Sequence, residues 1–274
     1  MRKVDLVALV ADVQAEHDAL ADLLVSVPDD AWDVATPAPG WSVGDQITHL
    51  AFFDGITRLA VADPAQFERF RDGIADLQEY VEGISEQGVW RTGAEKLHWW
   101  ADERRALLEA ALNAGPSHRV PWFGPSMSLA SKLTARLMET WAHGQDVVDA
   151  LDLNRPPSLR LKHVARIGVL ALPNSFLVNG LEVPQIPVRV SLEAPHGQGI
   201  WEWGDSAAAD SVEGRAEDFC LVVTQRRHVQ DTSLEVTGET ATAWMAIAQA
   251  FAGPPGEGRK PGQFPHKRRG ASPA

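Results

Sequence analysis

A glutamate and a histidine four residues apart, Glu139 and His143, form the clearest chemical signal in this 274-residue sequence. They lie in the segment Arg136-x-x-Glu139-x-x-x-His143-x-x-Asp146. Residues four apart on a helix share one face, about one turn from each other. A carboxylate and an imidazole in that relation can chelate one divalent ion, as paired helical ligands do in metalloenzymes. A surface carboxylate beside a core histidine is the alternative interpretation.

His49, in the segment Asp45-Gln46-Ile47-Thr48-His49-Leu50, is the third candidate ligand. It falls on the apolar side of an expected helix, close in sequence to Phe53. If this helix and the helix of Glu139 and His143 both face the interior of a bundle, the three side chains form a site with open coordination positions. Such sites are catalytic rather than structural. A buried histidine hydrogen-bonded to a neighbour is the alternative.

Helical periodicity predicts the elements that would hold these residues. The expected long helices cover residues 4–26, 42–62, 92–114 and 127–153. Ser42 is a typical N-cap, with Asp45 three residues later completing a capping box. Four long helices with connections of unequal length predict a four-helix bundle over residues 1–155.

The pattern changes after Pro156-Pro157. Short alternating runs predict strands near residues 188–192, 199–203 and 234–236, and helical periodicity recurs at 159–172, 216–225 and 240–251. We therefore expect a small α+β domain over residues 156–252, which makes the fold class α+β overall. Residues 253–274, rich in proline and glycine, are expected to be a disordered tail.

Composition excludes several classes of protein. The chain has 25 Lys+Arg against 37 Asp+Glu, a net charge of −12, which disfavours a nucleic-acid partner. A single cysteine excludes internal disulfides and cysteine-based zinc sites. No apolar run approaches the roughly 20 residues that span a bilayer, and acidic residues interrupt the N-terminal segment where a signal peptide would be apolar. We therefore expect a cytoplasmic protein without a membrane partner; the sequence does not indicate its oligomeric state.

Two motifs resemble a known family. They are Gly40-Trp41-Ser42 followed by His49-Leu50, and Glu139-Thr140-Trp141-Ala142-His143-Gly144-Gln145-Asp146. Together they resemble the metal-binding domain of the DinB-like superfamily, and specifically its mycothiol-dependent maleylpyruvate isomerase branch. Many DinB-like proteins use three histidines, whereas this branch has a glutamate in the second position, as Glu139 would supply. The segment Glu213-Gly214-Arg215-Ala216-x-Asp218-Phe219 resembles the second domain of the same branch, so the likeness covers about residues 5–252.

The resemblance implies that His49, Glu139 and His143 bind a divalent metal. Zinc suits two nitrogens and a carboxylate, and nickel, iron and manganese stay open. It also implies mycothiol as co-substrate: the thiol binds the metal through sulfur, and its thiolate adds to an electron-poor double bond of a small electrophilic substrate. Rotation and loss of the thiol give cis–trans isomerisation, and an adduct that does not collapse gives S-transfer.

Other side chains near these motifs have two interpretations each. Arg136 would hold a substrate carboxylate or form a helix salt bridge to Glu139. Asp146 would orient His143 or lie in solvent. Asp45 would orient His49 or lie in solvent, besides capping its helix. Arg136 and Asp146 are the catalytic candidates. The aromatic residues close to the site in sequence are expected to wall a pocket or to pack in the core: Trp122, Phe123 and Trp141.

The remaining histidines and the cysteine are expected to be structural. His17 and His98 are expected to reach the bundle interior, and Cys220 is expected to be a buried packing residue.

Two further functions stay open at this point. One is a thiol-independent hydrolase or lyase, in which the metal activates water. The other is a non-catalytic module that binds a metal or a small molecule.

Overall fold

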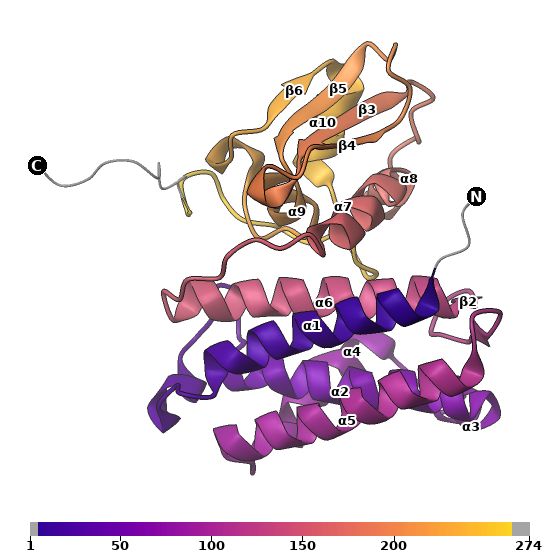
Figure 1. Ribbon diagram of the computed structural model, residues 1–274, viewed down its shortest axis with the longest axis vertical. Helices are drawn as coiled ribbons and strands as arrows, with labels where there is room; N and C mark the ends of the chain where they lie inside the picture. Colours follow the sequence, from indigo (N-terminus) through magenta and orange to yellow (C-terminus); the bar gives the residue numbers. More distant parts are fainter. Residues whose placement is uncertain (1–4, 265–274) are drawn as a thin grey trace, which may run out of the picture. The chain divides into compact units, whose positions relative to one another are not determined.

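Four long helices build the first part of the chain (Figure 1). They are α1 (Leu6–Leu24), α2 (Val43–Ala62), α5 (Gly93–Ala114) and α6 (Leu129–Ala150). In this computed structural model, which describes residues 5–264, α1 and α2 each contact both α5 and α6. The four-helix bundle expected from the periodicity is therefore present.

Short elements connect the long helices. They are the 3-10 helices η1 (Asp29–Asp33) and η2 (Gly83–Gly88), the helices α3 (Pro64–Asp72) and α4 (Leu77–Glu82), and the two-stranded hairpin of β1 (Arg119–Val120) and β2 (Met127–Ser128). The hairpin is not predicted by the sequence pattern because each strand has only two residues.

The start of α2 follows the predicted capping box. The Ser42 hydroxyl accepts a hydrogen bond from the Asp45 backbone N–H, and the Asp45 carboxylate accepts one from the Ser42 backbone N–H. This arrangement satisfies two of the donors that a helix N-terminus leaves without intrahelical partners. Behind it, apolar side chains of the bundle form a buried core that includes Leu20, Ile47 and Trp100.

The second part of the chain contains a four-stranded sheet. Its strands are β3 (Val188–Glu193), β4 (Ile200–Trp203), β5 (Asp210–Arg215) and β6 (Glu235–Thr237), in the order β4-β3-β5-β6. β3 and β5 are parallel, with Val190 opposite Val212, and the other pairs are antiparallel. The helices of this part are α7 (Leu161–Leu170), α8 (Leu172–Val178), α9 (Ala216–Val223) and α10 (Glu239–Ile247), with 3-10 turns η3 (Pro195–Gly197) and η4 (Val229–Asp231).

The chain thus divides into two compact units, residues 1–155 and 156–274, and its class is α+β. Each unit is described by itself here. Within the described residues, no helix is both long enough and apolar enough to cross a bilayer.

The second unit differs from the sequence expectations in three places. The helix predicted over 159–172 ends at Leu170, and a separate helix, α8, continues to Val178, with Pro173 in its first turn. Strand β5 was not predicted, because Val212 is its one large apolar residue. The predicted disordered tail is ordered over residues 253–264, where Gly256 and Gly262 donate backbone hydrogen bonds to Gln249 and Asp231. Residues 265–274 lie outside the described residues.

Candidate metal centre

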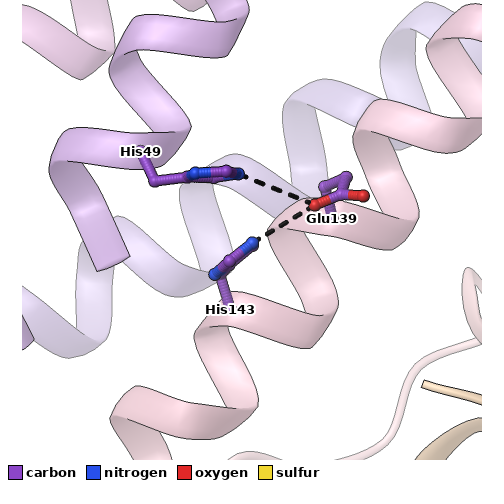
Figure 2. A group of neighbouring side chains, drawn as sticks. All are labelled: His49, Glu139 and His143. Atoms are coloured by element: carbon purple, nitrogen blue, oxygen red, sulfur yellow. Dashed lines mark hydrogen bonds and ion pairs between the residues drawn. The ribbon is translucent and has the colours of Figure 1, made fainter. Parts of the chain in front are cut away.

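Three side chains converge between α2 and α6 (Figure 2). The Nε2 atom of His143 lies 3.2 Å from Glu139 Oε2, and the Nε2 atom of His49 lies 3.9 Å from the same oxygen. The three ligand atoms are all within 4.8 Å of one another. The structure thus brings together the three residues that the sequence singles out, from two helices about 90 residues apart in the chain.

These distances suit a bound divalent ion. Zinc bonds to nitrogen and oxygen of about 2.1 Å place neighbouring ligand atoms of a tetrahedron roughly 3.4 Å apart. The two measured separations lie on either side of that value. Two imidazoles and one carboxylate leave a fourth position open, as in catalytic zinc sites. The residues present therefore fit the metal.

A hydrogen-bond chain fixes the ring of His143. The Thr36 hydroxyl donates to the Trp41 carbonyl, so its oxygen is free to accept from Gln46 Nε2. The amide oxygen of Gln46 then faces His143 Nδ1 and accepts a hydrogen bond from it. This tautomer leaves the lone pair of His143 on Nε2, the atom that faces Glu139.

Aromatic rings enclose His49. Its ring lies 4.4 Å from that of His143, 4.6 Å from Phe53 and 5.2 Å from Trp41, between ring centroids. Trp41 also stacks on His143, at 5.8 Å and 22° between planes. The Nδ1 atom of His49 is buried without a hydrogen-bond partner among the described residues. Ring packing rather than hydrogen bonding therefore orients His49.

Burial and mutual contacts set the protonation of the site. Burial, together with the neighbouring His143, lowers the pKa of His49 to about 4. Burial alone would raise the pKa of Glu139, but its contacts with His143 and His49 hold that pKa well below its usual range. At neutral pH His49 is therefore a neutral imidazole and Glu139 an ionised carboxylate. Metal binding requires those two states.

Arg136 pairs with Asp54 and not with Glu139, the helix partner that was one of its two interpretations. Its Nε donates to Asp54 Oδ1 at 2.8 Å, and its Nη2 donates to the Leu50 carbonyl at 3.3 Å. Asp54 also accepts a hydrogen bond from Trp100 Nε1 at 2.9 Å, and its carboxylate lies 3.5 Å from His17 Nε2. All these side chains are buried in the bundle. Arg136 is therefore paired with a buried carboxylate, and its catalytic role stays a prediction.

The sequence interpretation missed Gln46 and Asp54. A signal for each is present in α2: Gln46 lies three residues before His49 on the same helical face, and Asp54 is an acid within the apolar stretch 50–56.

One of the expectations about the other histidines is wrong. His98 does not lie in the bundle interior, because its side chain is 81% exposed and pairs with Asp102 on the same helix. His17 is buried, as expected. Asp146 is fully buried in α6, which excludes the solvated interpretation, and its orienting role stays a prediction. Asp45 caps α2.

Two of the three aromatic residues expected near the site, Trp122 and Phe123, pack in a cluster of rings. Trp122 stacks on Phe67 at 5.5 Å and 5°, and lies 6.4 Å from Phe53, which contacts His49. Phe123 packs against Phe67 and Trp122 in the same cluster. Trp141 is buried, and its ring lies 5.0 Å from the guanidinium of Arg155. Trp122 is thus connected to the candidate metal centre through Phe53.

Comparisons with known proteins give the family. Residues 13–148 match the mycothiol maleylpyruvate isomerase N-terminal domain. Two proteins of Mycobacterium tuberculosis, from strains CDC 1551 / Oshkosh and ATCC 25618 / H37Rv and both described as uncharacterized, are 45% identical over 251 residues, 91% of this chain and 97% of theirs. The crystal structure of the mycothiol-dependent maleylpyruvate isomerase is similar with a TM-score of 0.57 at 14% identity, and that of a histidine-to-alanine mutant with 0.58 at 13%. Both cover 82% of this chain and 90% of their own.

The fold and the site define a class of protein in which a helical bundle with a His-Glu-His triad is followed by a small α+β unit. The chain belongs to the mycothiol maleylpyruvate isomerase family. At 13–14% identity, the two crystal structures establish the shared fold alone.

Proposed function

We propose that this protein is a divalent-metal enzyme that uses a low-molecular-weight thiol, mycothiol, for isomerisation or S-transfer on a small electrophilic substrate. The observation that carries the proposal is the convergence of His49, Glu139 and His143 in a site with an open ligand position. Membership of the mycothiol maleylpyruvate isomerase family supports the choice of thiol.

The residues of the chain have distinct parts in this function. His49, Glu139 and His143 would hold the ion, and Gln46 keeps His143 in the required tautomer. A bound divalent cation lowers the pKa of a coordinating thiol, so that the thiolate persists at neutral pH. Because Glu139 is the single charged ligand of the three, the loaded site keeps a net positive charge, which favours an anionic sulfur. The rings of Trp41 and Phe53 pack against His49 and hold it in place.

The cysteine of the chain is a poor candidate for the nucleophile, which favours an external thiol. Cys220 is fully buried in α9, and burial, together with the charge of Glu217, raises its thiol pKa well above the usual value. A buried thiol with a raised pKa holds little thiolate at neutral pH. An added thiol is therefore needed for this chemistry.

The test is turnover of maleylpyruvate by zinc-loaded protein, with and without mycothiol. We expect loss of substrate to require both the metal and the thiol, and His143→Ala to abolish it. Product analysis then separates the two reactions: the trans isomer indicates isomerisation, and a stable thiol adduct indicates S-transfer. Turnover that is equally fast without thiol would contradict the proposal in favour of a metal-dependent hydrolase or lyase.

A further inference from the structure

The side chain of Lys132, in α6, is buried. Lys132 is 3% exposed, and among the described residues it forms no ion pair with a carboxylate. The Nζ atom instead lies over the face of Trp122, 2.7 Å from the ring centroid. Burying a charge is costly unless a partner compensates for it, and a cation–π contact compensates for only part of that cost. The site of Lys132 is therefore short of negative charge.

Lys132 faces the same side of α6 as the candidate metal ligands. It lies seven residues before Glu139, which is two helical turns, or about 10 Å along the axis. A chain of ring contacts joins the two positions: His49 to Phe53 at 4.6 Å, Phe53 to Trp122 at 6.4 Å, and Trp122 to Lys132. Lys132 and the triad therefore border one aromatic wall.

The neighbouring charged residues already have partners of their own. Arg136, one turn after Lys132, forms its ion pair with Asp54, and Glu139 lies against the two histidines. Burial lowers the pKa of Lys132 well below its ordinary value, and the charge of Arg136 lowers it further. The carboxylates of Glu139 and Asp54 act in the opposite direction without reversing the shift. An anion bound against Lys132 would offset the cost of burying its charge.

We propose that Lys132 binds a carboxylate of the electrophilic substrate, at the Trp122 end of the aromatic wall. This inference rests on the proposed function, because it assigns the substrate that would meet the thiol. It assigns to Lys132 the role of binding a substrate carboxylate that the sequence suggested for Arg136, because Arg136 forms an ion pair with Asp54.

The first arm of the test uses the metal-free protein and succinate, a small unreactive dicarboxylate. Calorimetric titration should show binding to the wild type that weakens about tenfold or more in Lys132→Met, as expected for losing a charged hydrogen bond. Lys132→Arg should retain most of the affinity, because it keeps the charge. Lys96→Met is the matched control, since the ammonium of Lys96 donates to the Arg91 carbonyl. Equal affinity of wild type and Lys132→Met, or no binding to the wild type, would overturn the assignment.

The second arm tests whether the carboxylate site serves the metal centre. Cobalt-loaded protein is titrated with a mercaptoalkanoate and with a mercaptoalcohol of equal length, and the sulfur-to-cobalt absorption reports binding. The carboxylate probe should bind about tenfold more tightly than the alcohol in the wild type, and equally in Lys132→Met. The alcohol should bind both proteins alike, which also verifies that the variant is folded. A preference that persists in Lys132→Met would overturn the assignment, whereas failure of both thiols to bind the wild type would contradict the proposed function.

Discussion

His143 presents Nε2 to Glu139 because a chain of hydrogen bonds begins at a backbone carbonyl, that of Trp41. This carbonyl accepts a hydrogen bond from the Thr36 hydroxyl. The Thr36 oxygen accepts a hydrogen bond from Gln46 Nε2, and the Gln46 amide oxygen accepts one from His143 Nδ1. Each donor in the chain has one possible direction once the Trp41 carbonyl is fixed as an acceptor. The tautomer of a candidate metal ligand is thus set by the loop that precedes α2.

Replacing Gln46 tests this account of the tautomer. Gln46→Leu keeps the size of the side chain and removes the acceptor, so we expect zinc affinity to fall about tenfold or more, as for other hydrogen-bond partners of metal ligands. Competition with a chromogenic chelator measures the dissociation constant. Gln14→Leu is the control, because Gln14 bonds Asp18 on α1. Unchanged zinc affinity in Gln46→Leu would show that the contact has no orienting role.

At the residue scale, sequence reasoning identified the triad because Glu139 and His143 share a helix and a recognisable motif contains all three residues. It could not predict the partner of Arg136, because Asp54 lies 82 positions earlier and meets it only through the packing of α2 on α6. Lys132 was missed for the same reason: its lack of a counter-ion is a property of the folded bundle.

At the element scale, α6 carries the polar residues in and near the candidate metal centre on one face. Lys132, Arg136, Glu139 and His143 follow at intervals of three or four residues, so that their side chains line up along the helix. Helix α2 supplies Gln46, His49 and Asp54 opposite them. Asp54 joins three helices, because it accepts hydrogen bonds from Trp100 of α5 and Arg136 of α6.

The Asp54–Arg136 pair should therefore be strongly coupled to the packing of these helices. Asp54→Leu leaves the Arg136 guanidinium buried without its counter-ion, which we expect to lower the free energy of unfolding by about 3–5 kcal/mol. The double variant Asp54→Leu/Arg136→Met removes both charges and should recover most of that loss. Urea unfolding followed by circular dichroism measures both.

An exposed acid provides the comparison for this prediction. Asp102 pairs with Arg105 and His98 on the outer face of α5, with its side chain 44% exposed, so Asp102→Leu should change stability by less than about 1 kcal/mol. Equal losses in Asp54→Leu and Asp102→Leu would contradict a special role for the buried pair.

Helix boundaries were predicted well wherever a cap or a proline marks them. Ser42 begins α2 and Thr92 begins α5, each with an acidic residue three positions later that completes a capping box. Strand β5 has no such signal. It lies between β3 and β6 in the sheet, and its position depends on backbone pairing that its sequence, Asp-Ser-Val-Glu-Gly-Arg, does not show.

At the scale of the whole molecule, two buried histidines connect stability to pH. Burial lowers the pKa of His17 and of His49 to about 4 from an ordinary value of 6.5. Between those values the unfolded chain binds protons that the folded protein does not. Stability is therefore full above about pH 6.5 and falls as the pH drops toward 4.

The metal-free protein should lose about 2 kcal/mol per histidine, or about 4 kcal/mol from these two, when the pH falls from about 7 to about 5. His17→Gln should remove about half of the loss without touching the triad. Urea unfolding of both proteins at the two pH values measures the difference. A wild-type stability that is the same at both, or a variant with the same pH dependence as the wild type, would contradict the assigned pKa of His17.

The class of the whole fold was predicted by pattern and the family by motif. Helical periodicity predicts the bundle, and short alternating runs predict the α+β second unit, whereas the family resemblance came from short segments such as Glu213-Gly214-Arg215. These residues end β5 and lead directly into α9, where Asp218 accepts hydrogen bonds from Ser233. The contact between Trp122 and Lys132 was not predictable, because the two residues come together only after folding.

The most direct test of the central claim is the metal content of purified protein, measured by inductively coupled plasma mass spectrometry. We expect about one equivalent of a divalent metal in the wild type, by analogy with three-ligand catalytic sites, and loss of that metal in His49→Ala, Glu139→Ala and His143→Ala. His98→Ala, on the exposed face of α5, should keep it. A folded wild type that binds no metal even after addition of zinc or nickel, or triad variants that all retain it, would contradict the account.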